Sequence, residues 1–328
     1  MGTFSAVQLL NSETGEVTVT ELDESALPAG DVVVDVEYSD LNYKDGLTMA
    51  PGSALPRMLP LIPGIDFAGV VAESTHPRWT AGDRVVLNGF GIGTDRDGGL
   101  TQRTRVPGDW LLPVPRRFTT KDAAAIGTAG YTAALSVAAI RRLGITPESG
   151  PVLVTGASGG VGSVAINLLS ALGYDAVAST RHVEAERESL RALGAVDVVA
   201  PTVPESNAGL EKARWAAAID NVGSDVMTGL LGQLRYGGVV AVVGVAKGRK
   251  FTTTAMPFIL RGATVVGIES VYAAAADRIA AWQLLDDALD LDRLESVTRT
   301  IGLADAAAAS QQILAGEING RLVVDVNR

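Results

Sequence analysis

The segment from Val152 to Gly173 constrains the fold of this chain more than any other part of the sequence. It opens with the apolar residues 152–154, and a run rich in β-branched side chains is typical of a buried strand. A glycine-rich turn follows over residues 155–162, and the mostly apolar residues 163–172 then predict a helix that is capped by Gly173. A strand, a glycine-rich turn and a helix in this order are typical of a dinucleotide-binding site.

The small residues of this turn have expected roles. We expect Gly159 to let the backbone approach a pyrophosphate and Gly162 to let the helix and the strand pack closely. Ala157 stands where the common fingerprint has its first glycine, and alanine still permits a tight turn. The alternative is a flexible turn without a ligand, but the strand and the helix on either side favour the cofactor site. The predicted phosphate-binding residues are Ala157, Ser158, Gly159, Gly160, Val161 and Gly162.

The pattern of predicted strands and helices divides the chain into two parts. Up to about residue 120, short strands alternate with turns, which is typical of a barrel-like or sandwich-like β domain. After that point strands and helices alternate, which predicts a parallel sheet with helices on both faces. The strands expected in this sheet are residues 152–154, 176–180, 196–199, 216–220, 238–244 and 263–268.

The predicted fold class is therefore α/β, with a doubly wound Rossmann sheet and a separate β-rich domain. We expect the Rossmann domain over residues 123–270 and the β-rich domain over residues 1–122 and 271–328. The tail carries a predicted helix at 303–314 and a predicted strand at 321–326, which we expect to rejoin the first domain.

Composition excludes several kinds of site and partner. The formal net charge is −10, whereas nucleic acid and acidic membrane surfaces require clustered Lys and Arg. The chain has no cysteine, so disulfides and thiolate zinc sites are excluded, and His76 and His182 alone are a poor metal-ligand set. Its first ten residues lack the pattern of a signal peptide, and Gly, Pro or charged residues interrupt the apolar stretches before the ~20 residues that a membrane span needs. We predict a cytoplasmic protein with a small-molecule partner and no metal.

The end of the second strand of the sheet indicates which nicotinamide cofactor binds. In this fold an acidic residue at that place accepts hydrogen bonds from the ribose 2′-hydroxyl of NAD. This chain has Ser179-Thr180-Arg181 there, and two hydroxyls with a guanidinium suit a 2′-phosphate. The sequence therefore predicts NADPH, and the alternative is that Arg181 is an ordinary solvated charge.

Taken together, the motifs of the chain resemble those of the zinc-free medium-chain dehydrogenases/reductases, closest to the acrylyl-CoA reductase branch that often carries a quinone oxidoreductase label. The resemblance covers essentially the full length. It implies a GroES-like catalytic domain beside the Rossmann domain. Zinc-dependent members of the superfamily have a His-Glu pair after the glycine that matches Gly64, where this chain has Ile65-Asp66. The residues that carry the resemblance are Asp40–Asp45, Pro63–Gly69, Ile126–Tyr131, Thr155–Ser163 and Met256–Arg261.

The resemblance also implies a reaction. Alcohol oxidation without a Lewis acid loses the metal that stabilises an alkoxide, whereas reduction of an activated C=C bond needs none. Hydride from NADPH would add to the β-carbon, and the carbonyl or thioester would spread the charge as an enolate. The resemblance implies that Tyr43 lies against the nicotinamide and the substrate, where it either donates a hydrogen bond to the enolate oxygen or shapes the pocket. Asn42 is a candidate neutral donor, and Lys44 and Asp45 are a candidate ion pair. The alternative is that Asn42 and Asp45 only cap a turn or helix.

Further cofactor contacts follow from the fold and the resemblance together. Asn221 and Val245 follow the fourth and fifth strands, at the carboxyl ends where ligands bind. Ile259 and Ser270 match positions near the nicotinamide, and Asn319 is expected to close over it. Turn formation by Asn221 and Asn319 and core packing of Ile259 remain open as alternatives.

Three functions stay open on the sequence alone. The first is NADPH-dependent reduction of acrylyl-CoA, the second reduction of quinones or small enones, and the third a non-catalytic NADPH-binding sensor. Residues 265–268 are a candidate edge strand for a homodimer. A CoA ester needs cations for its phosphates, and the candidates in the first domain are Arg57, Arg78, Arg96, Arg103 and Arg105.

Overall fold

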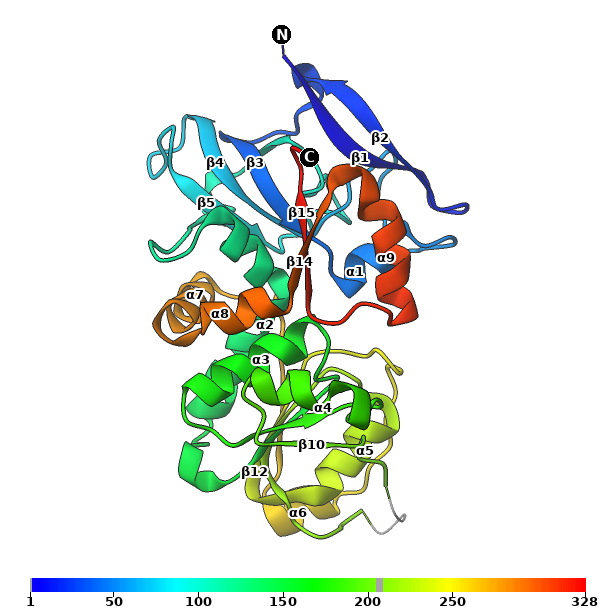
Figure 1. The fold of residues 1–328 in the computed structure, drawn as a ribbon, viewed down its shortest axis with the longest axis vertical. Helices are drawn as coiled ribbons and strands as arrows, with labels where there is room; N and C mark the ends of the chain where they lie inside the picture. Colours follow the sequence, from blue (N-terminus) through cyan, green and yellow to red (C-terminus); the bar gives the residue numbers. More distant parts are fainter. Residues whose placement is uncertain (1, 205–208) are drawn as a thin grey trace. The chain divides into compact units, whose positions relative to one another are not determined.

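The computed structural model describes residues 2–204 and 209–328. Their contacts divide the chain into two compact units. Unit 1 comprises Met1–Thr128, Ser270–Tyr272 and Val297–Arg328, and unit 2 comprises Ala129–Glu269 and Ala273–Ser296. Unit 2 holds a parallel sheet flanked by helices and unit 1 is rich in antiparallel strands (Figure 1), so the predicted α/β class with a separate β-rich domain is confirmed.

The parallel sheet of unit 2 has the strand order of a dinucleotide-binding fold. Its six strands pair in the order β10-β9-β8-β11-β12-β13, so the direction of winding reverses between β8 and β11. In such sheets ligands bind outside the carboxyl ends of the strands at this reversal. Leu153, Ala218 and Val240 from three of the strands pack on Met227 and Leu230 from a covering helix. The strands are β8 (Val152–Thr155), β9 (Ala176–Ser179), β10 (Asp197–Val199), β11 (Trp215–Asp220), β12 (Leu234–Val242) and β13 (Thr264–Gly267).

The helices of unit 2 include a pair that the sequence analysis assigned to the other domain. Residues 273–296 belong to unit 2 rather than to the β-rich domain, because Asn167 exchanges hydrogen bonds with Asp290 and Arg293 binds Ser170 and the Leu193 carbonyl. The helices are α3 (Gly160–Ala171), α4 (Val183–Ala192), α5 (Ser224–Gln233), α6 (Met256–Arg261), α7 (Ala275–Ala288) and α8 (Leu291–Ser296).

The main sheet of unit 1 joins the last two strands of the chain to strands from its first part. Its seven strands pair in the order β14-β15-β3-β4-β5-β7, with β6 also on β3, and β1 and β2 form a separate hairpin. The expectation that the last strand rejoins the first domain is confirmed, since β15 runs antiparallel to β3 with Val323 opposite Asp40 (Figure 1). The strands are β1 (Thr3–Asn11), β2 (Glu16–Asp23), β3 (Val32–Asp40), β4 (Asp66–Ser74), β5 (Arg84–Asn88), β6 (Arg103–Val106), β7 (Leu112–Pro113), β14 (Thr298–Gly302) and β15 (Arg321–Asp325).

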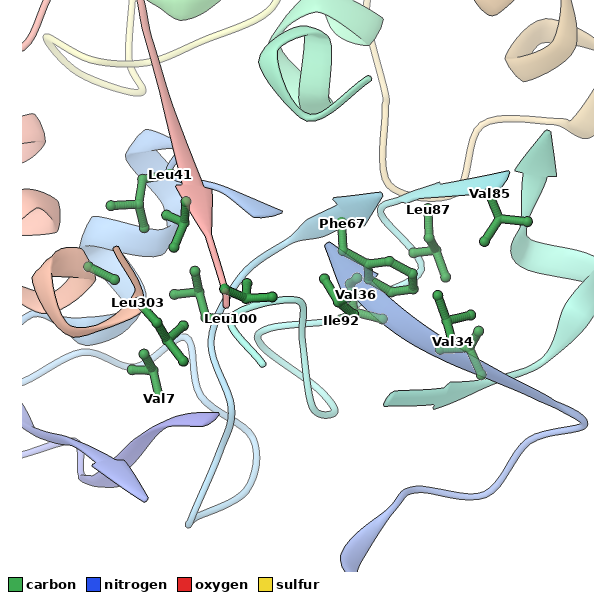
Figure 2. Packing of buried hydrophobic residues seen from close by; sticks show 14 of the residues in the cluster. Val7, Val34, Val36, Leu41, Phe67, Val85, Leu87, Ile92, Leu100 and Leu303 are labelled. Atoms are coloured by element: carbon green, nitrogen blue, oxygen red, sulfur yellow. The ribbon is translucent and has the colours of Figure 1, made fainter. Parts of the chain in front are cut away.

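The core of unit 1 lies between this sheet and two short helices, α1 (Tyr43–Met49) and α9 (Ala306–Ala315). Phe67 is surrounded by alternate residues of the neighbouring strands, including Val34, Val36 and Leu87 (Figure 2). This period-two burial is what the alternation in the sequence predicts for strands with one core face.

One further helix, α2 (Thr120–Arg142), is kinked at Gly127, where φ is +50°. A Cβ atom at Gly127 would lie 2.5 Å from Asp40 Oδ2 and 2.6 Å from Arg321 Nη2, so only glycine fits there. Among the described residues α2 is the one helix long and apolar enough to cross a membrane, but 83% of its apolar window is buried in the protein, as in a core helix.

Candidate cofactor and active site

The glycine-rich turn of unit 2 is built as a cradle. Gly156 has a φ of +58°, so the left-handed residue of the tight turn is Gly156 and not its neighbour Ala157. A Cβ atom at Gly162 would lie 2.4 Å from the Gly156 carbonyl oxygen, so the missing side chain lets the start of α3 pack closely on the glycine-rich turn. Helix α3 begins with no side-chain cap and no acidic residue in its first turn. Its first N–H groups therefore keep their capacity to bind an anion.

The loops after β8, β11 and β12 are tied together at the carboxyl edge of the sheet. The Thr155 hydroxyl donates to Asp220 Oδ1 at 2.6 Å, and the Asn221 amide Nδ2 donates to the Thr155 carbonyl at 2.7 Å. Burial raises the pKa of Asp220, although hydrogen bonds from Thr155 and two backbone N–H groups oppose this. The Lys247 N–H donates to the Val222 carbonyl at 2.9 Å, which holds the loop after β12 against this edge. The structure thus brings the glycine turn, Asn221 and the loop that carries Val245 to one edge of unit 2.

Two buried side-chain oxygens at this edge, Ser179 Oγ and Asn221 Oδ1, have no hydrogen-bond partner among the described residues. Buried polar atoms are ordinarily paired, so unpaired ones beside a phosphate cradle fit a hydroxyl-rich dinucleotide. These orphaned atoms and the open start of α3 are the structural features that fit a nicotinamide cofactor.

The end of β9 differs in detail from the sequence prediction. The Thr180 hydroxyl donates to Glu186 Oε2 at 2.5 Å and accepts from the His182 N–H, so α4 holds it inside the protein. Arg181 is exposed, and it forms no ion pair with any described residue. Of Ser179, Thr180 and Arg181, which were predicted to bind the 2′-phosphate, Arg181 is therefore the one whose polar group faces solvent and forms no ion pair with a described residue. Sequence reasoning missed the buried carboxyl of Glu186.

Ile259 is not brought to this edge. It lies on α6 with 70% of its surface exposed. The guanidinium of Arg261, two residues later, donates to the carbonyls of Gly232 and Leu234, at the amino end of β12. Val245 follows the opposite end of the same strand. The place of Ile259 in unit 2 therefore does not support the prediction that it lies near the nicotinamide. The resemblance identified the motif, but it did not show at which edge of the sheet the helix packs.

The other predicted site residues, Asn42, Tyr43, Ser270 and Asn319, all belong to unit 1. Tyr43 is the first residue of α1 and is 45% exposed. Asn42 precedes it as N-cap, and its amide Nδ2 donates to Asp40 Oδ1 at 2.9 Å and to Asp66 Oδ2 at 3.3 Å. Both amide protons of Asn42 are thus held by carboxyl groups, which favours a positioning role over donation to an enolate. Asn319 is exposed, next to Gly320.

Three carboxyl groups lie buried around Asn42. Asp45 accepts from the Asn42 N–H at 2.7 Å and from the Ile65 N–H at 3.0 Å, so it caps α1 and is not paired with Lys44 as the sequence suggested. Burial first, and then the charge of Asp66, raise the pKa of Asp45 to about 7. Burial raises the pKa of Asp66 to about 6, against hydrogen bonds from Thr128 and the two asparagines Asn42 and Asn88.

The third buried carboxyl group, that of Asp40, is paired with a cation. Asp40 pairs with Arg321 of β15, and Arg321 also donates to the Ala125 carbonyl at 2.6 Å. Burial lowers the pKa of Arg321 to about 10, which keeps the guanidinium charged near neutral pH. Among the described residues no group of three His, Asp or Glu side chains is arranged to hold a metal ion.

The arginines proposed for CoA phosphates are mostly committed elsewhere. Arg103 is paired with Glu24, Asp35 and Glu73. Arg78 binds Asp109, Arg96 stacks on Trp110 with its guanidinium carbon 4.8 Å from the ring centre, and Arg105 donates to the Pro28 carbonyl. Of the five, Arg57 is exposed and forms no ion pair with the rest of the described chain.

A basic segment that the sequence analysis did not single out lies in the loop after β12. Lys247, Arg249 and Lys250 are exposed there, and Asp225 is the acidic partner of Lys247 at 2.8 Å. Arg249 and Lys250 form no ion pair with a described residue. Their proximity in sequence to the carboxyl edge of β12 is the signal that could have identified them.

Comparison with known proteins places the whole chain among oxidoreductases. Residues 28–116 match the alcohol dehydrogenase GroES-like domain, and residues 160–287 match the zinc-binding dehydrogenase family. The chain is 45% identical over 314 residues to the acrylyl-CoA reductase AcuI of Ruegeria pomeroyi, covering 95% of each chain.

Two solved structures share the fold over nearly the full length. YhdH of Escherichia coli K-12, crystallised with NADPH, has a TM-score of 0.93 at 43% identity over 98% of this chain and 100% of that one. YhfP of Bacillus subtilis, crystallised with NAD, has a TM-score of 0.96 at 41% identity over 99% of this chain and 100% of that one.

Proposed function

Because the chain belongs to the zinc-free medium-chain dehydrogenase/reductase family of oxidoreductases, we propose that it reduces an activated C=C bond with NADPH, and that acrylyl-CoA is its substrate. The observation that carries this proposal is the 45% identity to an acrylyl-CoA reductase over 95% of both chains. The phosphate cradle at the carboxyl edge of unit 2 supports the cofactor half of the proposal.

Within this proposal, each part of the chain has a defined task. NADPH, when bound, supplies the hydride that adds to the β-carbon of the substrate. The uncapped N–H groups at the start of α3 bind the pyrophosphate. The unpaired side-chain oxygens of Ser179 and Asn221 accept hydrogen bonds from ribose hydroxyls. Tyr43 contacts the nicotinamide and donates its hydroxyl proton in a hydrogen bond to the developing enolate oxygen. A proton then reaches the α-carbon and completes the saturated thioester.

The cofactor preference rests on Arg181. A guanidinium beside the end of β9 stabilises a 2′-phosphate, whereas the buried Glu186 is held inside the protein by its hydrogen bond from Thr180. The relatives differ, because the E. coli YhdH crystals hold NADPH and the B. subtilis YhfP crystals hold NAD. Isothermal titration of the purified protein with NADPH and with NADH tests the preference, and tighter binding of NADH would contradict it.

A second candidate function is the reduction of quinones, which is favoured by the 42% identity to B. subtilis YhfP, a protein with a quinone oxidoreductase name. One assay separates the candidates: NADPH oxidation is followed with acrylyl-CoA, with a soluble quinone and with neither. We expect the highest kcat/KM with acrylyl-CoA. Activity with the quinone alone would favour the second function, and binding of NADPH without any turnover would favour a sensor.

The basic segment after β12 offers a way for unit 2 to recognise a CoA ester. Arg249 and Lys250 are cations that form no ion pair with a described residue. They follow the carboxyl end of β12, in the half of the sheet that holds the nicotinamide half of a dinucleotide in this fold. We propose that they attract the phosphates of CoA, which a quinone lacks.

We also propose a homodimer that pairs through β13. This strand is at the edge of the parallel sheet, and Val265 is 38% exposed on it. Exposed strand edges invite pairing across a twofold axis. Sedimentation equilibrium measures the mass of the assembly, and a monomer would contradict the proposal. The cytoplasmic location stays a prediction of the sequence, which fractionation of cells expressing the chain checks.

A further inference from the structure

We infer that Asp45 and Asp66 are positioning residues, which clamp Asn42 and so set the first turn of α1 and Tyr43 for catalysis. The inference rests on the proposed function, because it concerns how Tyr43 is held for that reaction. It assigns a task to two buried side chains that neither the sequence motifs nor the cofactor cradle explain.

The clamp joins four separate segments of unit 1 at one residue. Asp66, at the start of β4, accepts from Asn42 Nδ2 at 3.3 Å and from the Thr128 N–H at 2.5 Å. Asp45, on α1, accepts from the backbone N–H groups of Asn42 and Ile65. The second proton of the Asn42 amide goes to Asp40 at the end of β3. Asn42 is therefore fixed at its backbone and at its side chain, directly before Tyr43.

Within the part of the chain that the structure describes, two carboxyl groups of the clamp, those of Asp45 and Asp66, form no ion pair with a cation. Arg321, which reaches the cluster from β15, is paired with Asp40 of β3. Asp45 of α1 and Asp66 of β4 receive hydrogen bonds from backbone N–H groups and asparagine amides, and the charge of Asp66 acts on Asp45. Both are fully buried, at 0% and 1% exposure. Two anions in such surroundings favour the binding of one proton between them.

The raised pKa values of Asp45 and Asp66, about 7 and about 6, agree with this geometry. The ionised form of Asp45 uses both carboxylate oxygens as acceptors, one for Asn42 and one for Ile65. Protonation turns one of those oxygens into a hydroxyl group, which donates and is a much weaker acceptor than a carboxylate oxygen, so one of the two N–H hydrogen bonds weakens. The clamp is complete when Asp45 is ionised, and it loosens as the pH falls.

The test is the pH dependence of turnover in wild type and two variants. Wild type, D45N and D66N are assayed for NADPH oxidation with acrylyl-CoA from about pH 5 to pH 9. We expect the wild-type kcat to fall on the acid side with an apparent pKa between about 6 and 7. In D45N we expect kcat at high pH to fall by on the order of tenfold, because positioning is lost, and the acid limb to disappear. The affinity for NADPH, measured by fluorescence titration, should change less than about twofold.

D97N is the matched control. Asp97 is also a partly buried carboxyl of unit 1 with a pKa raised by burial, and it also accepts a backbone N–H, from Ile62 at 2.9 Å. It lies outside the clamp, so D97N should keep both the wild-type kcat and the acid limb. Loss of the limb in D97N as well would mean that any buried carboxyl of this unit acts through stability, and would overturn the inference.

The outcomes separate this inference from the proposed function. If wild type turns over and D45N keeps the fall in kcat at low pH, the clamp alone is refuted. If wild type does not turn over with any acceptor, the proposed function is refuted and the catalytic role of the clamp with it. If D45N and D66N fail to fold, carboxyl NMR of wild type labelled with [¹³C]aspartate replaces them. A carboxyl that titrates together with kcat supports the clamp, and the absence of any aspartate titrating above about pH 5 overturns it.

Discussion

Replacing Asp45 by asparagine should change how the stability of this protein depends on pH. In the folded chain, burial and the neighbouring Asp66 raise the pKa of Asp45 to about 7, from an ordinary value of 3.8. The folded state therefore binds a proton more tightly than the unfolded state does. The resulting stabilisation is fully present below the unfolded pKa and is lost as the pH rises through the folded pKa.

The size of this effect follows from the difference between the two pKa values. A shift of one pKa unit corresponds to about 1.4 kcal/mol, so about three units correspond to roughly 4 kcal/mol over the whole titration. The part that falls between pH 5 and pH 8 is about 2–3 kcal/mol, because the folded and unfolded states differ by nearly one proton only up to about pH 7. The side-chain amide that D45N introduces cannot ionise, so this contribution should be absent from that variant.

Urea denaturation of wild type and D45N at a series of pH values measures this contribution. The difference between the two free energies of unfolding cancels the titrating groups that do not interact with Asp45, and it should shift by about 2–3 kcal/mol in favour of D45N between pH 5 and pH 8. Each unit carries two tryptophans, Trp79 and Trp110 in unit 1 and Trp215 and Trp282 in unit 2, so fluorescence reports on both. If the difference in unfolding free energy changes by less than about 0.5 kcal/mol between pH 5 and pH 8, the raised pKa of Asp45 is refuted.

Three further substitutions test the proposed function. R181A should raise the KM for NADPH by about 10- to 100-fold and leave the KM for NADH within about twofold, because only the 2′-phosphate loses a charged hydrogen bond; equal effects on both cofactors would refute this role. Y43F should lower kcat by about 100-fold with unchanged NADPH affinity, and unchanged turnover would remove the hydroxyl from the mechanism. The R249A/K250A double variant should raise the KM for acrylyl-CoA about fivefold to tenfold and leave the KM for a quinone unchanged. The control is K212A, because Lys212 is an exposed lysine before the amino end of β11. A rise in the KM for both substrates would contradict CoA recognition.

Local signals predicted the fold well because each one acts within about 20 residues of chain. The strand, glycine turn and helix at 152–173 are close neighbours in sequence, and so are the alternating strands and helices that follow. The positive φ lies at Gly156, as the preference of glycine for left-handed backbone requires, whereas the match to the common fingerprint had drawn attention to its neighbour Ala157. Resemblance assigned roles to Ile259 and Thr180, but their neighbours Arg261 and Glu186 decide where these residues lie.

The long-range contacts of unit 1 carried no local signal. Arg321 reaches the Ala125 carbonyl 196 positions earlier and pairs with Asp40, and neither partner shows a sequence pattern that points to the other. The assignment of residues 273–296 failed for the same reason, because the bonds of Asn167 to Asp290 join positions 123 apart. Only the tertiary fold brings such residues together.

The buried carboxyl groups of Asp45 and Asp66 oppose folding at neutral and alkaline pH, and an apolar pair of similar size would remove that opposition. Helix capping alone does not require two buried carboxyl groups, because the side chain of an uncharged N-cap residue such as Asn42 can accept an N–H of the first turn at lower cost. What an uncharged pair cannot do is accept, at one point, the N–H groups of Asn42, Ile65 and Thr128 together with the Asn42 amide. Residues that lower stability while fixing a neighbouring group are expected where geometry matters more than stability. The residue so fixed is followed directly by Tyr43, and under the proposed function this juxtaposition ties the energetic cost to catalysis rather than to the fold.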